Sequence, residues 1–313
     1  MRILILFLVI FLPFAAAAQE TRTFNDDAGR TVTVPARPTR IASLHDIDIT
    51  IPLIELGVIP AASHGRVGLH GTPYIRSGAL LTGVDFDSSG MIYVGSNDID
   101  LETLAETKPD LIINATGRPT PVEALEKIAP TVVIDATRLG APHVYARLAE
   151  LTGTQAKLAV LDRRYRSGIA ALKQAVDTSS ITVSVFQPLN GKINTYHTYR
   201  ALGRVLRDAG FRFPKVIDAI PEGERIEVSA ERLPEFDANF IFDPYRTDTG
   251  GTSADEIAAM EEVMPDFCNF LKACREGRYI MVSREEAISN SYAALALMTA
   301  AVQASIAMRP LVD

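Results

Sequence analysis

The residues best suited to chemistry are arginines that follow predicted strands. A guanidinium is a planar fork of N–H donors, and it pairs strongly with carboxylates and other anionic oxygen groups. Ligands of open α/β sheets bind at the carboxyl ends of the strands, so arginines placed there are candidates for binding an anion. The candidates are Arg66, Arg118, Arg200 and Arg246, together with two tyrosines that can stack or hydrogen-bond, Tyr196 and Tyr245. The alternative for each arginine is a solvated surface charge.

Histidines offer a second chemistry, a metal site. His45, His64, His197 and Asp243 follow predicted strands, and three histidines with a carboxylate would suit zinc. The histidines form no close pair and the arginines would repel a cation, so we expect no metal site. A histidine or tyrosine as an axial ligand to haem is a further alternative. The sequence has no G-x-S-x-G motif, phosphate-binding glycine loop or dinucleotide fingerprint, so we expect no catalytic residues. A secreted hydrolase is a distant alternative.

The only two cysteines are Cys268 and Cys274. In an oxidising compartment such a pair is expected to be bridged. Six residues of continuous α-helix would separate them by about 9 Å along the axis, which is too far for a disulfide. The sequence therefore predicts either a helix break near Leu271 with a local disulfide, or two free thiols.

The elements that must position these side chains alternate between short β-branched runs and helical patterns, which predicts mainly parallel sheets covered by helices. A hairpin (residues 23–25 and 31–34) comes first. Further strands are predicted at 40–44, 58–62, 110–113, 131–134, 181–186, 239–242 and 279–282. Helices are predicted at 47–56, 100–107, 122–128, 200–209 and 293–308, and at a capping box that begins with Ser253. Residues 65–92 have no clear period and are predicted to be loop.

One long helix is predicted between two similar halves of the chain. Its apolar residues recur every three or four positions, at Leu158, Leu161, Tyr165, Ile169, Leu172 and Val176. Gly153 ends a shorter helix, and Thr154 offers an N-cap side chain. We expect two Rossmann-like α/β lobes, 19–141 and 178–313, joined by a connecting segment, 142–177, whose main strut is the rigid helix 154–176. The alternative is a surface helix within one large domain.

A short internal echo supports two lobes. The segment from Glu102 to the strand 110–113 matches the segment from Glu231 to the strand 239–242, with the glutamate, a leucine two residues on and the strand in the same register. The two copies lie on either side of the long helix, so the echo favours two pseudo-equivalent lobes over a chance match of generic helix-strand units.

The N-terminus predicts export. Arg2 precedes an apolar run over 3–14 and four alanines, which is typical of a signal peptide comprising residues 1–18. No cysteine lies near the cleavage site, so we expect no lipid anchor, and no later apolar segment is long enough to span a membrane comfortably. The net charge of −7 argues against a nucleic-acid partner. We expect a soluble periplasmic monomer.

The order of short segments along the chain resembles the ligand-binding proteins of ABC importers for ferric siderophores, a group whose lobes are joined by one helix. The matching segments are DAGR at 27–30, VTVP at 32–35, RIASL at 40–44, LG at 56–57, VG at 94–95, DLE at 100–102, KPDLII at 108–113, IAPTV at 128–132, Gly203 with VL at 205–206, AGF at 209–211, GRY at 277–279 and SYAAL at 291–295. The chain departs from this group in having no tryptophan, and in carrying YHTYR at 196–200 where a Tyr-Gly turn is common.

The resemblance implies that the lobes capture an anionic ferric siderophore and deliver it to an inner-membrane ABC permease dimer. The implied ligand contacts are the arginines and tyrosines named above, and the iron chelate is a ligand rather than a cofactor. The resemblance does not distinguish a catecholate, a hydroxamate or a citrate-type chelate. Haem or a metal ion is the alternative ligand. In the resembled family a glutamate on each lobe docks on the permease, which assigns that role to Glu102 and Glu231.

Overall fold

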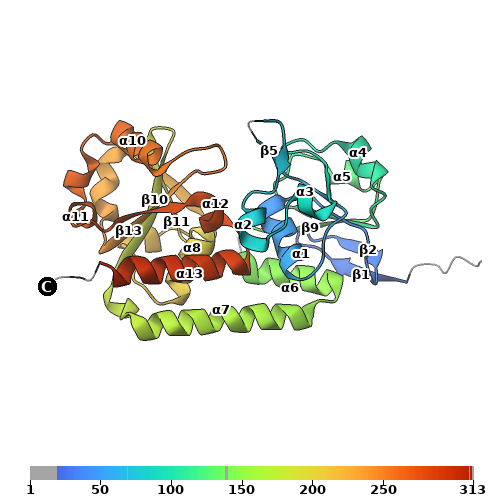
Figure 1. The fold of residues 1–313 in the computed structure, drawn as a ribbon, viewed down its shortest axis with the longest axis horizontal. Helices are drawn as coiled ribbons and strands as arrows, with labels where there is room; N and C mark the ends of the chain where they lie inside the picture. Colours follow the sequence, from blue (N-terminus) through green and yellow to red (C-terminus); the bar gives the residue numbers. More distant parts are fainter. Residues whose placement is uncertain (1–19, 69, 138–139, 310, 312–313) are drawn as a thin grey trace, which may run out of the picture.

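The computed structural model describes residues 20–68, 70–137, 140–309 and 311. Two α/β lobes lie side by side above one long helix (Figure 1). The predicted two-lobed α/β fold is confirmed. The predicted signal peptide, residues 1–18, lies outside the described residues. Among the described residues, no helix is both long and apolar enough to cross a membrane.

The N-terminal lobe is built on a five-stranded parallel sheet with the order β7-β4-β3-β8-β9. Its strands are β3 (Ile41–Ser43), β4 (Ala62–Ser63), β7 (Ile92–Tyr93), β8 (Leu111–Ala115) and β9 (Thr131–Ile134). The predicted hairpin forms as β1 (Thr21–Asn25) and β2 (Thr31–Pro35). The turn of this hairpin is fixed to the sheet, because the carboxylate of Asp26 accepts the backbone N–H of Val133 on β9.

The helices of this lobe are short. They are η1 (Asp46–Thr50, a π-helix), α1 (Ile51–Glu55), α2 (Gly78–Thr82), α3 (Phe86–Ser89), α4 (Leu101–Glu106) and α5 (Val122–Leu125). The prediction of loop for 65–92 was wrong: this segment holds β5 (Arg66–Val67), β6 (Pro73–Tyr74), α2, α3 and β7. Elements of two to five residues are too short to show a hydrophobic period, so only their tertiary packing reveals them.

The C-terminal lobe has a mixed five-stranded sheet with the order β12-β11-β10-β13-β14. Strands β10 (Val183–Leu189), β13 (Phe240–Tyr245) and β14 (Tyr279–Ser283) are parallel, whereas β11 (Lys192–Tyr196) pairs antiparallel with both β10 and β12 (Arg225–Val228). The β10–β11 turn is Asn190-Gly191, with φ angles of 52° and 71°, as a tight hairpin turn requires. The sequence did not predict β12.

The helices of the C-terminal lobe cover both faces of its sheet. They are η2 (Thr178–Ser180), α8 (Arg200–Asp208), α9 (Lys215–Asp218), η3 (Ala230–Phe236), α10 (Ser253–Val263), η4 (Phe267–Phe270), α11 (Lys272–Arg275), α12 (Arg284–Ile288) and α13 (Tyr292–Ala307). The capping box that opens α10 lies one residue earlier than predicted, with Thr252 as the N-cap and Asp255 as its partner. The chain breaks its helix at Leu271, between η4 and α11, and Cys268 and Cys274 form a disulfide there.

The connection between the lobes is α6 (Gly140–Thr152) followed by α7 (Gln155–Ala175), which runs beneath both lobes (Figure 1). The prediction that the side chain of Thr154 caps α7 was wrong. The hydroxyl of Thr154 instead hydrogen-bonds the hydroxyl of Thr152. Two tyrosine hydroxyls tie α7 to the C-terminal lobe: Tyr165 donates to Asp208 at 2.8 Å, and Tyr292 donates to Asp162 at 3.4 Å.

A second connection links the lobes at the start of α13. The carboxylate of Glu55, on α1 of the N-terminal lobe, accepts the backbone N–H groups of Tyr292 at 3.0 Å and Ala293 at 2.8 Å. Tyr145 on α6 donates its hydroxyl to the same carboxylate. Burial raises the pKa of Glu55. One hydrophobic core accordingly continues from the N-terminal lobe through α6 and α13 into the C-terminal lobe.

Candidate functional site

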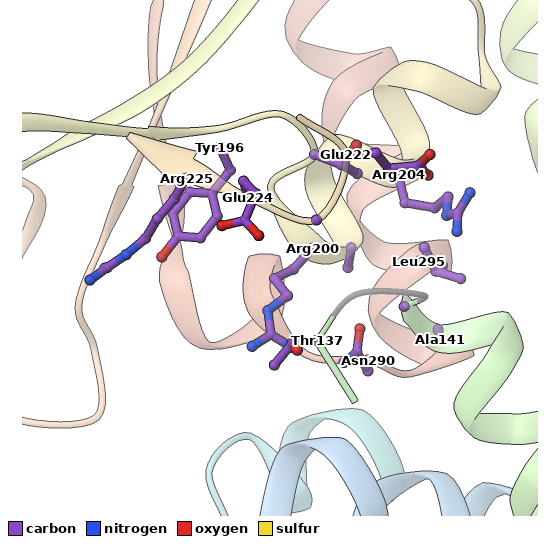
Figure 2. A pocket seen from close by; sticks show the side chains of 14 residues that line it. Thr137, Ala141, Tyr196, Arg200, Arg204, Glu222, Glu224, Arg225, Asn290 and Leu295 are labelled. Atoms are coloured by element: carbon purple, nitrogen blue, oxygen red, sulfur yellow. The ribbon is translucent and has the colours of Figure 1, made fainter. Parts of the chain in front are cut away.

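A pocket of about 280 Å³ lies between the lobes and takes residues from both (Figure 2). The N-terminal lobe and the start of α6 supply Thr137, Gly140 and Ala141. The C-terminal side supplies the remaining lining residues, which are Tyr196, Thr198, Arg200, Ala201, Arg204, Glu222, Gly223, Glu224, Arg225, Asn290 and Leu295. Of the predicted ligand-binding residues, the structure places Tyr196 and Arg200 in this pocket.

Arg200 forms the floor of the pocket and joins the two lobes. Its Nη1 donates to the carbonyl of Ala136 at 3.0 Å and lies 3.5 Å from Oδ1 of Asp48. Asn290 donates to the same two acceptors from the start of α13. The backbone of Arg200 has a φ of 44°, a left-handed conformation that non-glycine residues rarely adopt. Such strain is found where surrounding contacts hold a residue for function.

Arg66 and Arg118 lie on the N-terminal lobe outside the pocket lining, and we call them the N-lobe arginine pair. Arg118 follows β8, and its Nη2 donates at 2.7 Å to the carbonyl of Ser96. Burial lowers the pKa of Arg118, and the nearby charges of Arg66 and Arg76 lower it further. The carboxylates of Asp46 and Asp48 act in the opposite direction on the pKa of Arg118. Arg118 is therefore within electrostatic reach of Asp48, the residue that pairs with Arg200 in the pocket.

Arg246 and Tyr245 end β13 of the C-terminal lobe and do not line the pocket. Arg246 is already paired: its Nε and Nη2 both donate to the carboxylate of Asp248 at 3.1 Å. The Tyr74 hydroxyl on β6 donates to the backbone carbonyl of Asp248 at 2.9 Å, so this loop touches the N-terminal lobe. Among the predicted residues, the structure separates Arg246 and Tyr245 from Tyr196 and Arg200.

The histidines considered as an alternative metal site are held in other contacts where the structure shows their partners. His45 and His64 stack with ring centroids 5.6 Å apart, against the buried carboxylate of Asp46. Arg76 takes both oxygens of that carboxylate, at 2.8 and 2.7 Å. Burial lowers the pKa of His45 to about 4 and also lowers the pKa of His64. Among the described residues, no three His, Cys, Asp or Glu side chains are grouped as a metal site requires.

The C-terminal lobe buries acids that the sequence did not single out as a group. Asp243 is fully buried on β13, and Tyr279 donates to one of its oxygens at 2.5 Å. Burial raises the pKa of Asp243 well above its usual range. Glu256 on α10 is partly buried, which raises its pKa to about 7 although Arg284 and Arg246 act against this shift. This side of the molecule therefore holds carboxyls that favour their neutral form.

Residues 94–265, more than half of the chain, match the family model described as periplasmic binding protein. The chain belongs to this periplasmic binding protein family. Its sequence is 27% identical, over 76% of the chain, to the iron(3+)-hydroxamate-binding protein FhuD of Bacillus subtilis, of which 74% is covered.

The same fold occurs in solved structures. Staphylococcus aureus SirA complexed with staphyloferrin B superposes with a TM-score of 0.74 at 20% identity, covering 91% of this chain and 98% of SirA. Staphylococcus aureus FhuD2 with bound ferrioxamine B gives a TM-score of 0.67 at 21% identity, covering 85% of this chain and 97% of FhuD2. At these identities the likeness establishes the shared fold.

Sequence reasoning missed most of the pocket of this periplasmic binding protein. Glu222, Glu224 and Arg225 lie in and before β12, a strand that was not predicted. Asn290 precedes α13 and Thr137 follows β9, so the rule that ligands meet strand ends could have nominated Thr137. Asn290 had no signal in the sequence, because its role depends on contacts with Asp48 and Ala136 of the other lobe.

Glu102 and Glu231 occupy similar places on the two lobes of this family member. Glu102 is in the first turn of α4 and Glu231 in the first turn of η3, and both side chains are exposed. The residue before the following strand makes the same contacts in both lobes. The Asp110 side chain, before β8, accepts hydrogen bonds from the backbone N–H and the hydroxyl of Thr39, and the Asn239 side chain, before β13, accepts hydrogen bonds from the same two groups of Thr182. The echo in the sequence thus corresponds to a repeated structural unit.

Proposed function

We propose that this periplasmic binding protein is the substrate-binding component of an ABC importer and captures an anionic ferric siderophore between its lobes. The observation that carries the proposal is the pocket lined from both lobes. The N-terminal lobe adds an arginine pair for which the described residues supply no carboxylate partner, and Asp48, which pairs with Arg200 in the pocket, acts electrostatically on Arg118 of this pair. The relative that binds iron(3+)-hydroxamate, and the solved structures with staphyloferrin B and ferrioxamine B, support the same function.

In this proposal the chelate rests on Tyr196 and Arg200 in the pocket, and its anionic oxygens face Arg66 and Arg118. Desolvated guanidinium forks form strong charge-assisted hydrogen bonds to such oxygens. Arg246 and Tyr245 have a lesser role at the rim, because Arg246 must first leave Asp248. The iron chelate is the cargo, and the protein itself needs no resident cofactor and carries out no reaction.

Delivery to the permease is the second part of the proposal. Glu102 and Glu231 are exposed on corresponding places of the two lobes, so they can meet basic residues on two subunits of a membrane permease at once. We propose that the protein is exported by residues 1–18 and acts in the periplasm as a monomer. The long helix α7, tied to the C-terminal lobe by Tyr165 and Tyr292, would limit the motion of the lobes to small rotations.

Direct binding tests the proposal. The chain has nine tyrosines and no tryptophan, so quenching of tyrosine fluorescence reports a bound iron chelate without a tryptophan background. Titration with iron-loaded siderophores of the hydroxamate, catecholate and carboxylate classes should give saturable quenching with at least one class. Iron-free chelators are the control and should bind more weakly. If no iron chelate binds and haem does, the ligand assignment is wrong.

A further inference from the structure

The described residues pair some arginines of the two lobes with carboxylates and leave two without one. Four of these arginines each have a carboxylate, in the pairs Arg76–Asp46, Arg200–Asp48, Arg246–Asp248 and Arg284–Glu285. Arg66 and Arg118 have no ion pair within the described part of the chain. The Nε of Arg66 is buried without a hydrogen-bond partner there, and Arg118 donates to a neutral carbonyl. Burying a guanidinium without a counter-charge costs free energy that a bound anion would recover.

The C-terminal wall of the pocket holds two carboxylates without an ion-pair partner among the described residues, Glu222 and Glu224. The arginines of the same wall, Arg204 and Arg225, are paired with Asp208 and Glu227. Figure 2 shows Glu224 directed into the space between Tyr196 and Arg200. A carboxylate accepts hydrogen bonds and repels other anions, so this wall favours hydroxyl or ammonium donors. The site is therefore positive on the side of the N-lobe arginine pair and negative on the side of these glutamates.

The pocket offers little aromatic surface. Among its described lining residues, the apolar side chains are Ala141, Ala201 and Leu295, and Tyr196 supplies the one aromatic ring. Ligand sites for large apolar or aromatic groups are lined mainly by hydrophobic and aromatic side chains. Catechol rings would therefore find one stacking partner here, whereas a compact and oxygen-rich ligand would find hydrogen-bonding groups on each wall.

We infer that the site selects a carboxylate-type ferric chelate that is anionic at one end and carries hydroxyl or ammonium donors at the other. The carboxylate end lies on Arg66 and Arg118, and the donor end lies against Glu222 and Glu224. A ferric tris-hydroxamate has no net negative charge from its iron-binding groups to match the arginine pair. A ferric tris-catecholate is anionic on every side, so the glutamates oppose it. This inference rests on the proposed siderophore-binding function and names its ligand class.

A panel of iron complexes tests the ligand class by tyrosine quenching on the full mature protein. The probes are a ferric hydroxycarboxylate siderophore that carries a free ammonium group, ferrioxamine B for hydroxamates and ferric enterobactin for catecholates. We expect the ammonium-bearing hydroxycarboxylate chelate to bind roughly tenfold or more tightly than the other two, the size of one charge-assisted contact. If ferrioxamine B or ferric enterobactin binds as well or better, the inference fails while the proposed function stands. If none of them binds, the proposed function fails with it.

Two charge-removing variants test the orientation. Arg118→Gln should weaken binding of the ammonium-bearing hydroxycarboxylate chelate by roughly ten- to hundredfold and leave ferrioxamine B within about twofold. Glu224→Gln should instead strengthen ferric enterobactin about tenfold, because it removes a repulsive charge. Arg163→Gln, on the exposed face of α7, changes the net charge equally and should alter none of the three. Equal losses for all three chelates in Arg118→Gln would indicate a structural role and overturn the orientation.

Discussion

In the N-terminal lobe Arg66 and Arg118 have no carboxylate partner among the described residues, whereas in the C-terminal lobe Arg246 and Arg284 pair with Asp248 and Glu285. The sheets differ as well: the N-terminal sheet is wholly parallel, and the C-terminal sheet has an antiparallel edge formed by β11 and β12. Parallel strands bring all their carboxyl ends to one edge. In the C-terminal lobe the loop between α9 and β12, which precedes this antiparallel edge, brings Glu222 and Glu224 to the pocket.

This difference indicates a division of labour in the proposed site. The N-terminal lobe supplies unpaired positive charge, and the C-terminal lobe supplies an acidic wall together with arginines that are already neutralised. The outer surfaces differ less, since Glu102 and Glu231 occupy matching places. Substituting one residue on each lobe and comparing the effects can therefore separate two functions. Both lobes should contribute equally to docking on the permease, whereas the N-terminal lobe should contribute more to ligand binding.

The largest effect is expected from reversing both docking charges. Glu102→Arg combined with Glu231→Arg replaces attraction by repulsion at both proposed contacts with the permease. Uptake of iron chelate by cells should be lost, while the purified variant binds its chelate with unchanged affinity. Each single variant should be mild, because one exposed ion pair is worth about 0–1 kcal/mol. Normal uptake by the double variant, or a parallel loss of chelate binding, would refute the shared docking role.

The second-largest effect is expected on chelate binding, when one arginine of each lobe is replaced by alanine. Arg118→Ala should cost about 1.5–3 kcal/mol of chelate binding, as expected for hydrogen bonds to a charged group. Arg246→Ala should cost less than about 1 kcal/mol, because this exposed arginine is already paired with Asp248. Isothermal titration calorimetry on both variants measures the difference. Equal losses would show that Arg246 leaves Asp248 to bind the ligand, and the two lobes would then act as a symmetric clamp.

Stability should depend on pH in opposite directions in the two lobes. The pKa of His45 is lowered from 6.5 to about 4, so the unfolded chain binds more protons, and the contribution of His45 to stability is lost as the pH falls from about 6.5 to 4. The pKa of Glu256 is raised from 4.5 to about 7, so the folded chain binds more protons, and stability falls as the pH rises between these values.

The contribution of each residue to this pH dependence is measured by the melting temperatures of two variants between pH 4 and pH 8. Glu256→Gln removes the carboxyl and should raise the melting temperature most above pH 7, the value near which the wild-type group has ionised. His45→Asn keeps an acceptor for the backbone N–H of Asp48 and should flatten the loss of stability below about pH 6.5. A wild-type profile unchanged by both substitutions would exclude these residues as the source of the pH dependence.

The smallest effect is expected for the overall shape. The lobes are joined by α7, by the contacts of Glu55 with the start of α13, and by the bridge from Arg200 to Ala136. Small-angle scattering profiles with and without a bound iron chelate should therefore differ only slightly. A large compaction on binding would show that the lobes move independently and that α7 is not a rigid strut.

The sequence alone determined the features that depend on local patterns. The recurrence of apolar residues from Leu158 to Leu172 predicted the long helix, and the alternating residues at 23–25 and 31–34 predicted the N-terminal hairpin. The distance between Cys268 and Cys274 along a helix predicted a break if they were bridged, and the structure breaks the helix at Leu271. The match between the segment that begins at Glu102 and the segment that begins at Glu231 predicted corresponding places for the two glutamates. Each of these features depends on a pattern within a short stretch of sequence.

Only the tertiary structure decided how the charges are distributed. Arg200 meets Asp48, and the start of α13 meets Glu55, across separations of 152 and more than 230 residues. Four arginines looked equivalent because each follows a strand, yet folding neutralises Arg246 with Asp248 and Arg200 with Asp48, and leaves Arg66 and Arg118 without a carboxylate in the described structure. A charge becomes available to a ligand through burial and the partners that folding brings to it, and neither is encoded in spacing along the chain.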